Sequence, residues 1–302
     1  MNRRHFLNSA AALAISSRAK ASPDAHGFVK SICSVIFPPD KPVLEYFTAA
    51  KDAGFDGVEL RFGQDIAVDA SGDTLARIRE SANKAGVAIA SIWVSEPLSA
   101  SPLNDPSPEV RAKGVAAIQR ACDVASQVGC GALLLYPGRL GSGPRFDVGY
   151  ETTWQRFTEE LRKCLPAAEH HKVLLTPENV WNKFLLSPLE MRSFIDQFRS
   201  PWMRSHFDIG NVMQFGYPQD WILTLGSRIA RVHVKDYKLS NRAEQGHFVD
   251  LLRGDVDWKQ VMAALVKVGY KGFLSPEISY ERDQPDQLKT VSRQLDTIIA
   301  MA

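Results

Sequence analysis

Eight short apolar segments recur along the chain, separated by longer stretches with helical periodicity. The segments span residues 28–37, 55–62, 87–94, 130–138, 173–181, 203–211, 229–237 and 272–279. Most of them begin as continuous apolar runs, which is typical of parallel strands covered on both faces. Between them lie amphipathic stretches such as "TLARIRESANKAG". This alternation predicts an α/β fold with eight β/α units.

The number of units and the absence of a linker favour one domain, a single (β/α)8 TIM barrel. The alternative is an open, doubly wound sheet. In successive segments the polar residues fall at the C-terminal end, and that rim is where barrel active sites are built. The G-x-G-x-x-G fingerprint of a dinucleotide site does not occur in the sequence. We therefore expect the barrel.

The first 21 residues have the features of an export signal. Arg3 and Arg4 precede a short apolar run at 10–15, and "AKA" at 19–21 has the small-x-small form of a cleavage site. The run is too short to span a bilayer. We expect a twin-arginine signal peptide over residues 1–21, a mature barrel domain over 22–302, and a periplasmic or otherwise exported location.

The charge of the chain limits its possible binding partners, and the spacing of its cysteines limits their possible roles. The whole chain has 36 basic and 34 acidic residues, but residues 1–21 hold four basic residues and no acidic one. The mature chain therefore has 32 basic against 34 acidic residues, and no nucleic-acid partner is expected. No membrane span is expected either. The four cysteines lack metal-ligand spacing and are expected to be buried free thiols: Cys33, Cys122, Cys130 and Cys164.

Two of the apolar segments end in nearly the same way. Residues 173–179 read "VLLTPEN" and residues 273–278 read "FLSPEI". Proline has no N–H for a sheet ladder and restricts the residue before it, so we expect both strands to end stiffly at their prolines. Glu178 and Glu277 then face the mouth of the barrel.

Two further ligand-type residues end neighbouring strands. Asp208 ends the sixth segment and His233 lies in the seventh, while His206, two residues before Asp208, is expected to hold that carboxylate. Each residue alone has an ordinary explanation, as a solvated charge, a helix cap or a core histidine. Four such residues at the ends of four consecutive predicted strands favour a divalent metal site. Three carboxylates and one imidazole suit Mn²⁺, with Co²⁺ and Mg²⁺ as alternatives.

Residues near this rim are candidates for binding substrate. Lys235 shares a strand face with His233, although a pair with Asp236 is the alternative. Glu59 lies at the end of the second segment. Trp181 is expected to form an apolar wall against a sugar ring, with plain packing as the alternative.

The four-residue order also resembles a family. With "TPEN", "FDIGN", "HVKDYK" and "VGYKGFLSPEIS" in place, the chain resembles the xylose-isomerase-like TIM barrels, and more closely the sugar phosphate isomerase/epimerase superfamily. The resemblance covers the whole mature chain. It implies that the two glutamates act as base and acid on opposite faces of a sugar, and that Asn211 stands where several epimerases carry a substrate-binding His. The metal ligands it implies are Glu178, Asp208, His233 and Glu277.

We therefore expect a divalent-metal-dependent sugar isomerase or epimerase that removes a proton next to a carbonyl and forms an enediolate. A homo-oligomer is compatible with this reading. The same first step serves a lyase, deglycosidase or dehydratase acting on a keto-glycoside or keto-cyclitol, and these alternatives stay open. An endonuclease-type barrel needs more histidines than the sequence places near the site. Retention of both glutamates argues against a non-catalytic sugar-binding barrel.

Overall fold

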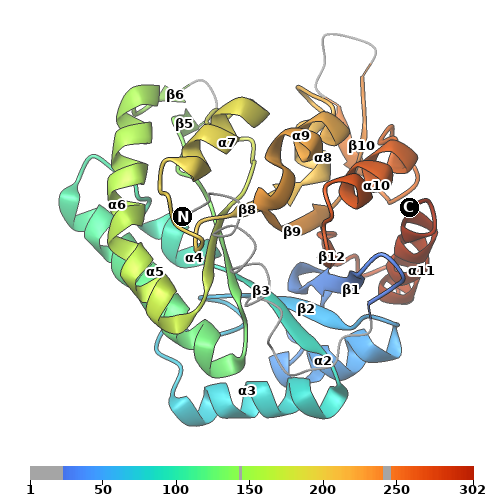
Figure 1. The fold of residues 1–302 in the computed structure, drawn as a ribbon. Helices are drawn as coiled ribbons and strands as arrows, with labels where there is room; N and C mark the ends of the chain where they lie inside the picture. Colours follow the sequence, from blue (N-terminus) through green and yellow to red (C-terminus); the bar gives the residue numbers. More distant parts are fainter. Residues whose placement is uncertain (1–22, 143–144, 241–245) are drawn as a thin grey trace, which may run out of the picture.

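A computed structural model describes residues 23–142, 145–240 and 246–302. The predicted signal segment at residues 1–21 lies outside the described residues. Within the described part, eight parallel strands form a nearly closed barrel surrounded by helices (Figure 1). The predicted (β/α)8 TIM barrel is confirmed, and the alternative of an open doubly wound sheet is wrong.

Each of the eight predicted segments contains one barrel strand. The strands are β1 (Phe28–Cys33), β2 (Gly57–Arg61), β3 (Ala88–Trp93), β4 (Ala132–Leu135), β7 (Leu174–Pro177), β8 (Ser205–Asp208), β9 (Ile229–Val234) and β12 (Gly272–Pro276). The sheet runs β7-β4-β3-β2-β1-β12-β9-β8. Two isolated parallel bridges, Leu175 to Met203 and Glu178 to His206, join β7 to β8 at the seam.

Both prolines end their strands, as predicted. Pro177 is the last residue of β7 and pairs with Leu135, and Pro276 is the last residue of β12 and pairs with Val234. The amide N–H of the glutamate after each proline still donates to the neighbouring strand, at 3.1 Å for Glu178 and 3.3 Å for Glu277. Each carboxylate is therefore held at the point where its strand leaves the barrel.

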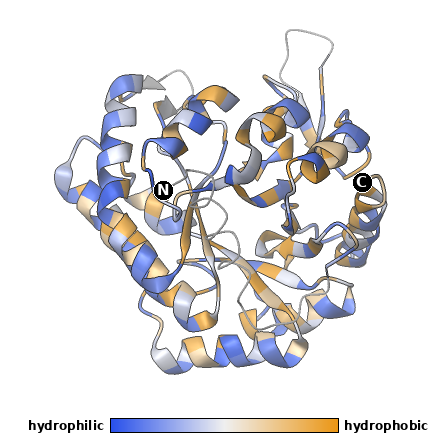
Figure 2. Cartoon of the chain, viewed as in Figure 1, coloured by the Kyte–Doolittle hydropathy of each residue, from blue (hydrophilic) through white to orange (hydrophobic). Residues whose placement is uncertain are grey.

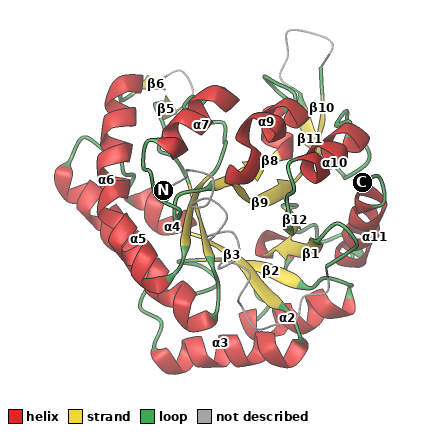
Figure 3. Ribbon diagram, in the orientation of Figure 1, coloured by secondary structure: helices red, strands yellow, loops and turns green. Residues whose placement is uncertain are grey.

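Helices cover the outside of the barrel (Figure 3), and hydrophobic and hydrophilic residues alternate along them (Figure 2). Helix α5 (Pro108–Val128) is capped by its own sequence: Ser107 accepts from the Val110 amide, and Gly129 ends the helix at φ 82°. The α-helices are α2 (Val43–Asp52), α3 (Gly72–Ala85), α4 (Ser95–Ala100), α5 (Pro108–Val128), α6 (Tyr150–His171), α7 (Pro188–Asp196), α8 (Ile209–Val212), α9 (Pro218–Leu225), α10 (Trp258–Lys267) and α11 (Gln287–Ile299). Short 3-10 turns span Ser34–Ile36 and Gly226–Arg228.

Two small antiparallel ribbons branch from the loops that follow barrel strands. One pairs β5 (Gly141–Ser142) with β6 (Arg145–Phe146), and the other pairs β10 (Asp236–Lys238) with β11 (His247–Val249). A single residue separates β9 from the start of the second ribbon. This ribbon therefore places its side chains directly beside the rim of the barrel.

The cysteines are free and buried, as predicted. Burial raises the pKa of Cys122 to about 12 and that of Cys130 to about 11, so both thiols stay protonated. Among the described residues, no helix combines the length and the apolar character that a membrane crossing requires.

Candidate metal centre

Four side chains from four adjacent strands meet at the C-terminal rim of the barrel. Each offers one ligand atom, and these atoms all lie within 4.8 Å of one another. Their strands are neighbours in the sheet order β12-β9-β8, with β7 completing the row across the seam. The structure thus brings together all four residues predicted as ligands: Glu178, Asp208, His233 and Glu277.

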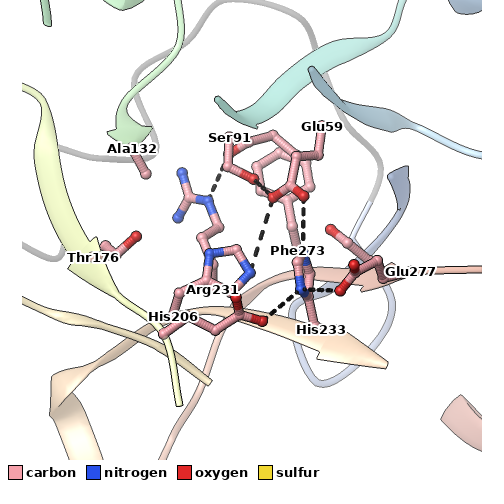
Figure 4. Close-up of polar contacts among 12 residues, drawn as sticks. Glu59, Ser91, Ala132, Thr176, His206, Arg231, His233, Phe273 and Glu277 are labelled. Atoms are coloured by element: carbon pink, nitrogen blue, oxygen red, sulfur yellow. Dashed lines mark hydrogen bonds and ion pairs between the residues drawn. The ribbon is translucent and has the colours of Figure 1, made fainter. Parts of the chain in front are cut away.

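The imidazole of His233 lies at the centre of this cluster. Its Nδ1 atom lies 3.0 Å from Glu277 Oε2, 3.1 Å from Glu178 Oε1 and 3.7 Å from Asp208 Oδ2. Its Nε2 atom lies 2.8 Å from Glu59 Oε1 on the other side of the ring. Figure 4 shows Glu59 on the side of the imidazole away from Glu277.

The Glu59 carboxylate determines which nitrogen of His233 faces the rim. Glu59 is fully buried, and its second oxygen accepts a hydrogen bond from Ser91. We infer that Nε2 carries the proton, because a carboxylate is an acceptor for that hydrogen bond. Nδ1 is therefore the nitrogen whose lone pair would be offered to a metal ion at the rim. A hydrogen bond of this kind on the far nitrogen is how proteins orient metal-binding histidines.

The composition of the cluster fits a divalent cation. If all three carboxylates are ionised, they exceed the one ammonium group that faces them, that of Lys235, by two negative charges. Although burial lowers it, Glu59 and the three rim carboxylates raise the pKa of His233, so without a metal ion Nδ1 carries a proton that these carboxylates share. A divalent cation among the same atoms would take the place of that proton. Oxygen-rich sites with one imidazole suit Mn²⁺ or Mg²⁺ rather than structural zinc.

Asp208 is held in place through its backbone and one of its two oxygens. Its Oδ1 atom accepts from the Asn211 amide at the start of α8, at 2.7 Å. The Asn179 side chain clamps its backbone, donating to the carbonyl and accepting from the amide, both at 2.8 Å. Its Oδ2 atom is buried without a hydrogen bond among the described residues, although Lys235 Nζ lies 3.0 Å away. That oxygen remains available as a ligand.

The two glutamates differ in their affinity for a proton. Burial raises the pKa of Glu178 to about 7, despite the opposing effect of His233. Burial would raise the pKa of Glu277 as well, but Lys235, 2.6 Å from its Oε2, and His233 hold it well below its usual value. Before a metal ion binds, Glu178 therefore takes up a proton far more readily than Glu277, which is ionised at neutral pH.

Lys235, predicted to bind substrate, lies against the cluster itself. Its ammonium pairs with Asp208 and Glu277 and lies 5.2 Å from the Phe248 ring centre. The alternative prediction, an ion pair between Lys235 and Asp236, is wrong. The Asp236 carboxylate instead accepts hydrogen bonds from the Trp258 indole and from backbone amides that include those of Tyr237 and Gly254. Lys235 therefore stands between the cluster and the second ribbon.

The other predicted substrate-binding residues have distinct places. Asn211 is 6% exposed, and its side-chain amide donates to the Asn179 carbonyl at 3.0 Å. Trp181 is 42% exposed and donates to the Asn211 carbonyl at 2.9 Å. Glu59 lies beneath His233, away from the mouth of the barrel. Among these residues, Trp181 has the most exposed side chain.

The partner predicted for His206, Asp208, is wrong. Neither ring nitrogen of His206 hydrogen-bonds among the described residues, and its nearest carboxylate is Glu59, at 3.9 Å. Burial and the positive charges of His233 and Arg231 lower the pKa of His206, so the ring stays neutral. The residue that holds Asp208 is Asn179, which was not predicted from the sequence. Its position directly after Glu178 in the "TPEN" motif was the available signal.

Comparison with known families and structures agrees with this architecture. The family model described as xylose isomerase-like TIM barrel matches residues 47–298. A search of curated proteins gave no match to the sequence.

Several solved structures are similar in fold. A D-psicose 3-epimerase has a TM-score of 0.75 and 17% sequence identity, with 90% of this chain and 97% of that chain covered. An L-ribulose 3-epimerase has a TM-score of 0.70 and 19% identity, covering 90% and 93%. The 3-keto-D-glucoside 4-epimerase from E. coli has a TM-score of 0.71 and 15% identity, covering 91% and 99%. At these identities the likeness shows the fold.

Proposed function

This chain belongs to the xylose isomerase-like TIM barrel family, and from that premise we propose that it is a metal-dependent sugar isomerase or epimerase. The observation that carries the proposal is the convergence of three carboxylates and the Nδ1 atom of His233 at the barrel rim. The similar folds of sugar epimerases support it. A divalent ion held by these four residues would supply a Lewis acid to a substrate carbonyl oxygen.

Glu178 and Glu277 supply the proton chemistry in this proposal. They are the outer members of the row of four strands, on either side of Asp208 and His233. An ionised Glu277 is the base that removes a proton from the carbon next to the carbonyl, and a protonated Glu178 returns one. In the metal-free site the pKa of Glu178 is raised and that of Glu277 is lowered, which supports the assignment of one acid and one base.

Lys235 has a supporting role. Its ammonium holds Glu277 ionised and adds a positive charge where an oxygen of the substrate becomes negative. Asn179 and Asn211 keep Asp208 aimed at the cluster, and Glu59 keeps Nδ1 of His233 directed to the rim. The site is therefore organised before a substrate arrives.

Solvent-deuterium exchange tests the proposal. Metal-loaded protein is incubated in D₂O with a panel of ketoses and keto-glycosides, and deuterium at the carbon next to the carbonyl is measured. We expect Glu178→Gln and Glu277→Gln each to lower turnover by at least about 10²-fold, the low end of general acid–base contributions. Each Gln keeps an oxygen for the ion but removes the titrating group.

Glu159→Gln is the matched control, because Glu159 is an exposed carboxylate on α6 that lies outside the cluster of four and away from the rim. It should retain near-normal exchange. If either variant in the cluster retained it too, the two-glutamate mechanism would be wrong. Release of an aglycone from a keto-glycoside, with the same dependence on both glutamates, would reassign the enzyme to the lyases.

A further inference from the structure

Two cavities of different character adjoin the metal cluster. The first, called here the polar cavity, has a volume of about 350 Å³ and a lining that is slightly more polar than apolar, with Lys235, Asp250, Glu277 and Ser279 in its wall. The second, of about 320 Å³, is mostly apolar; its walls include Leu98, Pro102, Leu103, Tyr136, Val180 and Trp181. The polar cavity contains a member of the metal cluster, whereas the apolar cavity lies beyond Trp181.

The apolar cavity is close to the reacting centre. Val180 and Trp181, in its wall, follow Glu178 by two and three residues. The Trp181 ring stacks on Phe248 at 5.0 Å, and Phe248 lines the polar cavity. Burial, together with the negative charges of Glu178 and Glu277, raises the pKa of Tyr136, another wall residue. A ligand anchored at the cluster is therefore within reach of the apolar cavity.

The apolar cavity is poorly suited to sugar hydroxyl groups. Two of its polar side chains are already engaged: Asn182 donates to the Gly138 carbonyl and accepts from the Phe184 amide at 3.1 Å, and Trp181 donates to the Asn211 carbonyl. Two others, Ser99 and Arg139, are exposed to solvent. A hydroxyl buried there without a partner costs free energy, whereas an apolar group gains it. An apolar cavity of about 150 Å³ holds benzene. The cavity here, at about 320 Å³, therefore has room for an aryl group.

We propose that the substrate is a keto-sugar that carries an aryl aglycone, with the sugar at the metal cluster and polar cavity and the aryl ring in the apolar cavity. This inference rests on the proposed function and narrows its substrate class. The exposed guanidinium of Arg139, in the wall of the same cavity, lies where it can stack on such a ring.

Binding of glycosides that lack the keto group tests the inference without any turnover. Phenyl and methyl D-glucopyranosides, in both anomeric forms, are titrated into metal-loaded protein by calorimetry. Burial of the phenyl ring should make the better phenyl anomer bind at least about tenfold more tightly than its methyl counterpart. Equal affinities, or no measurable binding of any of the four, would overturn the inference.

A cavity-filling variant locates the aryl site. Ser99 lies in α4, is exposed and lines the cavity, so Ser99→Trp fills it without disturbing the core. Ser99→Trp should remove the phenyl advantage. Ala100→Trp is the matched control, exposed on the same helix but outside the cavity wall, and should keep the advantage. A phenyl advantage that survives in Ser99→Trp would place the ring elsewhere and overturn the inference.

The outcomes separate this inference from the function on which it rests. If metal-loaded protein exchanges deuterium into free keto-sugars but shows no phenyl advantage, the aryl inference alone fails. If no sugar in the panel exchanges, the proposed function fails, whatever the glucosides show.

Discussion

At the scale of single residues, Glu59 is the side chain whose role depends most on the folded structure. Its contact with His233 joins residues 174 positions apart in the chain. The ligands themselves were predictable, because each ends an apolar segment and strand ends meet at one rim. A hydrogen bond to the far nitrogen of His233 leaves no pattern in the sequence, so the sequence alone suggested a substrate contact for Glu59.

The metal affinity of a Glu59→Gln variant tests this role. Gln still accepts a hydrogen bond from His233 but carries no negative charge, so Nδ1 becomes a weaker donor to a metal ion. We expect about tenfold weaker binding of Mn²⁺, measured by competition with a chelating dye. Glu160→Gln, a buried carboxylate on α6 far from the cluster, should bind Mn²⁺ normally. If Glu59→Gln bound Mn²⁺ as tightly as the wild type, Glu59 would not contribute to the metal centre.

At the scale of elements, the strand ends were predictable and the ribbon after β9 was not. The predicted segment 229–237 continues through Asp236 and Tyr237, which leave the barrel and pair with β11. The cause is Asp236, whose carboxylate accepts from backbone amides at Tyr237, Gly254 and Val256. Those partners are up to 20 residues away, beyond the reach of a hydrophobic pattern.

Packing of α5 against α6 depends on a buried carboxylate. Glu160 is 2% exposed and accepts from Arg111 at 3.0 Å and from Lys163 at 2.6 Å. Burial alone would raise the pKa of Glu160, but these two cations outweigh it and hold the pKa below its usual value. Ionised Glu160 therefore stabilises the folded state above the unfolded-state pKa, and this stability is lost as the pH falls through the folded-state pKa.

Glu160→Gln should lower the free energy of unfolding by about 1–3 kcal/mol at neutral pH, because it weakens two charge-assisted hydrogen bonds. Urea denaturation between pH 7 and pH 3 measures the difference from the wild type. The difference should shrink as the pH falls below about 4. A difference that stayed constant over this range would mean that the charge of Glu160 contributes nothing.

At the scale of the whole molecule, the barrel places all the chemistry at one end and leaves substrate choice to the loops. The order of eight strands followed from the alternating pattern, since parallel β/α units close in sequence order. The apolar cavity did not follow from that pattern, because its walls come from helix α4 near Leu98 and from two loops, near Tyr136 and Trp181, that are separated along the chain. Fold therefore indicates the type of site and not its substrate.

We predict that the substrate is unphosphorylated. Residues 1–21 predict export, and phosphorylated sugars are scarce outside the cytoplasm. Of the described residues that line the two cavities, Lys235 and Arg139 are basic, and Lys235 already pairs with Asp208 and Glu277. A phosphate group would call for more positive charge or a helix N-terminus. Comparison of kcat/KM for a sugar and its phosphate ester decides this, and a clear preference for the ester would contradict it.

Metal content measured together with activity tests the central claim most directly. Protein purified without chelators should contain about one divalent ion per chain by elemental analysis, most of it manganese. His233→Ala should lose the ion and the activity together, whereas His247→Ala, an exposed histidine on β11, should keep both. A metal-free protein that is fully active, or a His233→Ala variant that retains its ion and its turnover, would contradict the account.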